Sequence, residues 1–149
     1  MSTQAYKVAE IGISYSADYE SKLFIKDAEH ACKVLRKMWD PELLKIQEQF
    51  SVLYLNNQNR VNGFRCLSTG TCDEAVVDIK LLLGIACKSL SSKIIIAHNH
   101  PSGVKEISKC DLMLTRRIRK ACSSLGIELL DHIILTPKDY VSFFELKKI

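Results

Sequence analysis

Two histidines, His98 and His100, stand two residues apart in the second half of the chain. Alternate side chains leave the same side of an extended backbone, so both imidazoles can contact a single metal ion. A Pro-Ser-Gly turn at residues 101–103 follows, and then Ser108 and Asp111, which share one face of a helix that begins there. Two imidazoles and one carboxylate are the ligands typical of a catalytic zinc ion, whose fourth position is left for water. The motif therefore predicts a hydrolytic zinc site formed by His98, His100 and Asp111.

Each half of this motif also has a simpler interpretation. Ser108 and Asp111 precede an apolar run with the spacing of a capping box, in which hydroxyl and carboxylate bind free backbone N–H groups. A His-x-His pair also occurs in many strands that bind no metal. Taken separately, the halves favour capping and an ordinary strand, whereas their combination favours the metal site.

The spacing from His98 through His100 to Ser108 and Asp111 resembles the metal motif of JAMM (MPN-type) metalloproteins. The RadC-like branch is the most similar, through His-Asn-His-Pro-Ser-Gly at 98–103, Leu-Thr-Arg-Arg at 114–117 and Leu-Asp-His at 130–132. The resemblance runs from about Gln47 to the C-terminus. It implies one JAMM/MPN-like domain with a mixed, mainly antiparallel sheet flanked by helices. It also implies zinc-dependent hydrolysis of a peptide or isopeptide bond, with a peptide or protein as substrate.

Members of this family carry a glutamate at the start of a central strand, where it acts as general acid and base. The segment that begins at Glu48 resembles that strand entry, and Glu42 and Glu74 are alternatives. The resemblance further implies that the Ser108 hydroxyl donates to the oxyanion. Asp131 and His132, on the strand after the helix, are candidates for contacting a ligating imidazole, although an ordinary capped or solvent-facing pair fits them equally well.

Strands and helices are expected to alternate, which predicts one mixed α/β domain over residues 1–149. In this domain an N-terminal strand and helix (1–46) pack on a core that holds the metal site (47–149). Asp27, Asp78 and Ser108 are the expected helix N-caps, and Gly126 the expected C-terminal stop. The expected elements are strands at 6–15, 49–55, 60–67, 93–97, 127–136 and 140–144, a loop at 68–71, and helices after residues 27, 78 and 108.

Composition places the chain among ordinary cytoplasmic domains. The 149 residues are 47% hydrophobic and 26% charged, which suits one globular domain. No apolar run approaches the roughly 20 residues of a membrane span, and the N-terminus lacks a signal-peptide pattern. The six cysteines contain no Cys-x-x-Cys pair and are expected to be reduced thiols. The sequence predicts no oligomeric state.

Two other functions remain open at this point. A formal net charge of +4 is modest, and basic residues cluster at Arg116, Arg117, Arg119 and Lys120. This cluster could bind DNA in a repair or mobile-element accessory protein without peptidase activity, although a solvated helix face is the simpler interpretation. The helix-hairpin-helix region expected in longer RadC-like proteins does not fit in this chain. A non-catalytic scaffold is the other alternative, and the complete ligand set argues against it.

Overall fold

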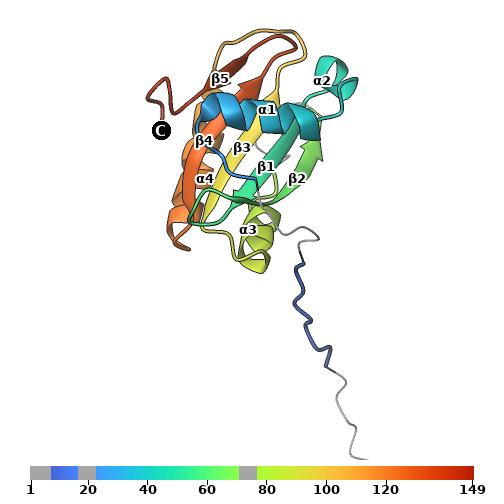
Figure 1. Ribbon diagram of the computed structural model, residues 1–149, viewed down its shortest axis with the longest axis vertical. Coiled ribbons are helices and arrows are strands. Elements are labelled where there is room, and N and C mark those ends of the chain that lie inside the picture. Colours follow the sequence, from blue (N-terminus) through green and yellow to red (C-terminus); the bar gives the residue numbers. More distant parts are fainter. Residues whose placement is uncertain (1–7, 17–22, 71–76) are drawn as a thin grey trace, which may run out of the picture.

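The computed structural model of the chain describes residues 8–16, 23–70 and 77–149. Within these ranges the elements form one five-stranded sheet with helices packed against it (Figure 1). In chain order they are α1 (Ala28–Met38), α2 (Leu43–Ile46), β1 (Gln49–Leu55), β2 (Val61–Thr69), α3 (Ile79–Lys88), β3 (Lys93–Asn99), α4 (Lys109–Ser123), β4 (Glu128–Leu135) and β5 (Tyr140–Ser142). The predicted mixed α/β class is confirmed.

The strand order across the sheet is β2-β1-β3-β4-β5. The pairs β1–β2, β1–β3 and β4–β5 are antiparallel, whereas β3 and β4 are parallel, which confirms the mainly antiparallel sheet. Parallel neighbours need a crossover connection, and α4 provides it between β3 and β4. The C-terminal end of β3 and the first turn of α4 therefore lie at the same end of the sheet, as the motif requires.

Residues of β3 alternate between two apolar clusters on opposite faces of the sheet. Ile95 and Ala97 pack in a cluster with residues of α1, whereas Ile94 and Ile96 pack in a cluster with residues of α3 and α4. Because both faces are covered, residues 94–97 of the strand are all apolar, as the sequence predicts. The same alternation carries His98 to the α4 face and Asn99 to the α1 face.

The predicted helix ends are confirmed at four places. Asp27 accepts a hydrogen bond from the His30 amide (2.8 Å), and Asp78 caps α3. Ser108 precedes α4, and Gly126 has the left-handed backbone (φ 69°) that ends helices. No helix among the described residues combines the length and the apolar character needed to cross a membrane.

The predicted N-terminal strand is wrong for residues 8–16, where the backbone forms no strand, and Tyr6 lies outside the described residues. Ile11 and Ile13 are 87% and 81% exposed. A strand needs a partner, and the outer edge of β2 is approached instead by residues 23 and 24, through Val61 N to Leu23 O (2.7 Å) and a Phe24–Arg60 bridge.

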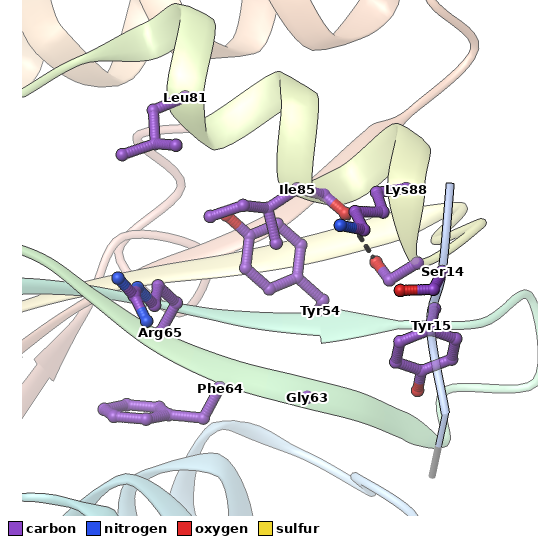
Figure 2. A pocket seen from close by; sticks show the side chains of 10 residues that line it. Ser14, Tyr15, Tyr54, Gly63, Phe64, Arg65, Leu81, Ile85 and Lys88 are labelled. Atoms are coloured by element: carbon purple, nitrogen blue, oxygen red, sulfur yellow. Dashed lines mark hydrogen bonds between the residues drawn. The ribbon is translucent and has the colours of Figure 1, made fainter. Parts of the chain in front are cut away.

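Tyr15 is nevertheless placed against the domain. Its hydroxyl donates to the Asn62 carbonyl (2.5 Å). Together with Ser14 it lines a pocket of about 370 Å³ between β2 and α3 (Figure 2). Three smaller differences concern strand ends. β2 runs to Thr69, into the predicted loop, β3 runs to Asn99, two residues past its predicted end, and β5 ends at Ser142, two residues before its predicted end.

Candidate metal centre

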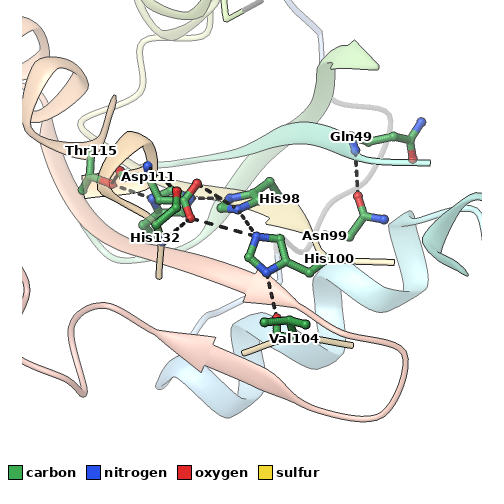
Figure 3. A network of polar contacts seen from close by, with 9 residues as sticks. Gln49, His98, Asn99, His100, Val104, Asp111, Thr115 and His132 are labelled. Atoms are coloured by element: carbon green, nitrogen blue, oxygen red, sulfur yellow. Dashed lines mark hydrogen bonds and ion pairs between the residues drawn. The ribbon is translucent and has the colours of Figure 1, made fainter. Parts of the chain in front are cut away.

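Three polar side chains converge where β3 ends and α4 begins (Figure 3). His98 Nε2 lies 3.0 Å from His100 Nε2 and 3.3 Å from Asp111 Oδ1, and His100 Nε2 lies 4.0 Å from Asp111 Oδ2. One ligand atom from each of the three residues falls within 4.8 Å of the others. The structure thus brings His98, His100 and Asp111 together, as the motif predicts.

The donor set of this group fits a metal ion. The side chains of His98 and Asp111 are 2% and 1% exposed, whereas His100 is 14% exposed, so the group opens to solvent on the His100 side. Two imidazole nitrogens and one carboxylate oxygen suit zinc better than Mg²⁺ or Ca²⁺, which prefer all-oxygen sites. A metal ion held here would be enclosed by protein and reachable from one side.

The electrostatics favour neutral imidazoles at His98 and His132. Burial lowers the pKa of His98 to about 4, with the Asp111 carboxylate opposing this shift and His100 adding to it. Burial also lowers the pKa of His132 well below its ordinary value. Neutral imidazole is the form that binds metals, because one ring nitrogen then carries a lone pair.

Ser108 and Asp111 form the capping box that their spacing predicts. Ser108 Oγ accepts from the Asp111 amide (3.0 Å), and Asp111 Oδ2 accepts from the Ser108 amide (2.9 Å). The cap uses Oδ2 and leaves Oδ1 facing His98. The helix N-terminus also stabilises the carboxylate anion. Capping and metal binding are therefore compatible interpretations of the same two residues.

Glu48 lies half-buried directly before β1, which pairs with β3 in antiparallel register. Phe50 is opposite His98, so extending the register by two residues puts Glu48 opposite His100. The alternative Glu42 is exposed at the start of α2, and Glu74 lies outside the described residues. Of the two glutamate candidates within the described residues, the strand register thus favours Glu48 over Glu42.

Asn99, which sequence reasoning missed, fixes the segment that carries Glu48. It is fully buried between the two histidines in the sequence, on the opposite face of β3. Its Oδ1 accepts from the Gln49 amide (2.7 Å), and its Nδ2 donates to the carbonyls of Leu44 (3.0 Å) and Gln47 (2.9 Å). A buried amide side chain needs hydrogen-bond partners. An asparagine that directly follows an apolar strand is therefore the feature of the sequence that could have predicted the role of Asn99.

Asp131 and His132 point to opposite sides of β4 and have different partners. His132 is fully buried, and its Nε2 lies 2.7 Å from His98 Nδ1. Asp131 instead accepts from the Ser142 hydroxyl (2.5 Å) and the Phe144 amide (3.0 Å), at the end of β5. Of this pair, only His132 contacts a histidine of the metal group.

No cysteine belongs to the metal group found among the described residues. Cys66 donates weakly to the Ser68 carbonyl (Sγ to O, 3.6 Å) and Cys110 is exposed on α4. Among the free cysteines of the described residues, Cys32 and Cys122 are buried, whereas Cys87 and Cys110 are exposed.

Comparison with known proteins agrees with this geometry. Residues 25–148 match a family model described as RadC-like JAB domain. The chain is 37% identical over 145 residues to UPF0758 proteins of Streptococcus pyogenes strains NZ131, SSI-1 and MGAS8232, and each alignment covers 93% of this chain. The chain spans 64% of the length of these relatives. With its matching core and the converging histidines and aspartate, the chain belongs to the RadC-like JAB domain family.

Proposed function

We propose that this protein is a zinc-dependent metallohydrolase that cleaves a peptide or isopeptide bond. The observation that carries the proposal is the convergence of His98, His100 and Asp111, with ligand atoms within 4.8 Å, in a group open on the His100 side. Three protein ligands and an accessible fourth position are typical of catalytic zinc. Family membership supports the same reaction class.

In this proposal His98, His100 and Asp111 hold the ion. Zinc in such a site supplies a Lewis acid that lowers the pKa of a ligating water to about 7. Glu48, at the level of His100 in the strand register, takes a proton from the attacking water and later gives it to the leaving nitrogen. This assignment explains why Asn99 holds the Glu48 segment by three hydrogen bonds.

Ser108 has a separate role in the proposed reaction. Its oxygen accepts from the Asp111 amide, so its hydroxyl hydrogen remains available to donate to the substrate carbonyl. That donation stabilises the negative charge that develops on the carbonyl oxygen, a contribution of about 3 kcal/mol for comparable donors. A peptide or protein is the substrate class that this chemistry requires.

The metal site is tested by elemental analysis of protein purified without added metal. We expect about one zinc ion per chain in the parent, and little in Asp111→Ala and in the double variant His98→Ala/His100→Ala. Two matched controls keep the zinc: His30→Ala removes a histidine on α1, and Ser108→Ala breaks the capping box without removing a ligand. A parent that takes up no zinc after reconstitution contradicts the proposal.

The role of Glu48 is tested with fluorogenic peptides and lysine-linked isopeptides as probes. We expect Glu48→Gln to keep its zinc and lose hydrolysis, because the amide cannot accept the proton. Glu42→Gln is the matched control, since Glu42 lies at the start of α2 and should leave the rate unchanged. Full activity in Glu48→Gln would remove the assigned base, and lost activity in Glu42→Gln would move the role to that residue.

A second candidate function, DNA binding, is favoured by the outer face of α4. Arg116, Arg119 and Lys120 are exposed and line a hollow of about 480 Å³ with Ser123 and Ser124. Salt-dependent binding of duplex DNA that disappears in Arg116→Ala/Arg119→Ala/Lys120→Ala supports it, since phosphate contacts release counterions. Equal binding by parent and triple variant refutes it.

A further inference from the structure

A chain of buried hydrogen bonds connects the main chain of Asp111 to the ring of His98 (Figure 3). Thr115 Oγ1 lies 2.6 Å from the Asp111 carbonyl oxygen and 2.6 Å from His132 Nδ1. His132 Nε2 then lies 2.7 Å from His98 Nδ1. Thr115, His132 and His98 are all buried, so water has no access to compete for these bonds.

The direction of every bond in this chain follows from its first member. A carbonyl oxygen can only accept, so the single hydroxyl hydrogen of Thr115 points to the Asp111 carbonyl. Thr115 Oγ1 must therefore accept from His132, whose Nδ1 carries the hydrogen. A neutral imidazole has one N–H, which makes His132 Nε2 an acceptor. The hydrogen between the two rings consequently belongs to His98 Nδ1.

The ring of His132 is also held in place by aromatic neighbours. It stacks on Phe143 with ring centroids 4.3 Å apart and an interplanar angle of 24°. Phe50 packs edge-on against it at 6.3 Å. The backbone places it beside β3, where His132 pairs with Ile96. These contacts oppose a ring flip that would exchange the two nitrogens.

We infer that Thr115 and His132 are positioning residues that hold His98 in the tautomer with hydrogen on Nδ1 and a lone pair on Nε2. That lone pair lies at the atom 3.3 Å from Asp111 Oδ1, where the proposed function needs a metal ligand. The role as a ligand rests on the proposed function, whereas the tautomer does not. The hydrogen-bond chain starts on the backbone of one ligand and ends on the ring of another, so it couples the orientation of both.

The tautomers are tested by nitrogen-15 NMR of the imidazoles in the metal-free protein, which contains four histidines. We expect His98 and His132 both to carry hydrogen on Nδ1. Thr115→Val removes the hydroxyl at nearly constant shape, so His132 should shift toward the Nε2–H form and His98 should follow. Thr115→Ser should restore the parent pattern, because it keeps the hydroxyl.

Zinc affinity provides the second measurement, by competition with a chelator of known affinity. We expect Thr115→Val to weaken zinc binding by about tenfold or more, and Thr115→Ser to stay close to the parent. Ser89→Ala is the matched control, because Ser89 donates to a carbonyl four residues back (2.8 Å) in α3, away from the site. Equal affinity in parent and Thr115→Val overturns the positioning role.

Failure of this inference is distinguishable from failure of the proposed function. Hydrogen on Nε2 of His98 in the metal-free parent overturns the inference, even if the protein binds zinc. Hydrogen on Nδ1 without zinc uptake overturns the proposed function and leaves the tautomer assignment in place. The spectrum of the parent decides the tautomer even if the Thr115→Val variant fails to fold.

Discussion

Replacing Asn99 by alanine should destabilise the protein and loosen the segment before β1. The side chain makes three hydrogen bonds, to the Gln49 amide and to the carbonyls of Leu44 and Gln47. All three belong to the short stretch that carries Glu48, and Asn99 itself is fully buried. Alanine supplies no replacement donor or acceptor.

The magnitude follows from the number of bonds. A hydrogen bond contributes about 1 kcal/mol net to stability, and more when its loss leaves a buried partner unpaired. Three bonds therefore predict a loss of about 3 kcal/mol in the free energy of unfolding. The matched control is Asn62→Ala, which removes another buried asparagine whose Nδ2 contacts the Ser89 carbonyl and Ser91 Oγ. These two Nδ2 bonds predict a loss of at least about 2 kcal/mol there.

Urea unfolding measures both losses, and amide hydrogen exchange locates them. We expect faster exchange of the Gln49 amide in Asn99→Ala and not in Asn62→Ala, because only Asn99 accepts from that amide. A loss below about 1 kcal/mol in Asn99→Ala, or unchanged exchange at Gln49, would refute the assignment of Asn99 as the anchor of this segment.

Two further predictions concern stability. In metal-free protein the free energy of unfolding should fall as pH drops from about 6.5 toward 4. Burial lowers the pKa of His98 to about 4 and also lowers the pKa of His132. The unfolded chain therefore takes up protons in this range that the folded state does not. Urea unfolding with a chelator at several pH values measures this, and a flat profile contradicts it. Leu114→Ala should lower the free energy of unfolding by about 2 to 5 kcal/mol, because Leu114 is 1% exposed. Met113 is 55% exposed, so Met113→Ala should change the free energy of unfolding by less than about 0.5 kcal/mol. Similar losses in both variants would contradict the burial argument.

Local chemistry explains which elements could be predicted from the sequence. The helix ends at Asp27, Asp78 and Ser108 depend on side chains within three residues, and the structure has each of them. Residues 94–97 of β3 are all apolar because both faces of the strand are covered, and their composition predicts that burial. The segment at 8–16 has the alternation of a strand, but alternation cannot specify a partner edge, so the prediction failed there.

At the site, too, contacts between residues close in the sequence could be predicted, and contacts that depend on strand pairing could not. Residues 98 to 111 contain all three members of the metal group, so their spacing was sufficient to predict the cluster. The contacts of Thr115, His132 and Asn99 depend on which strand lies beside β3 and in what register, and no local pattern specifies that. Side chains of β3 alternate between the two faces of the sheet, so the end of this strand makes contacts on both faces. One face carries His98 to Asp111 and His132, and the other carries Asn99 to the Glu48 segment. A change in the register of β3 would therefore disturb the proposed ligands and the proposed base together, so the sheet itself keeps the two halves of the site aligned.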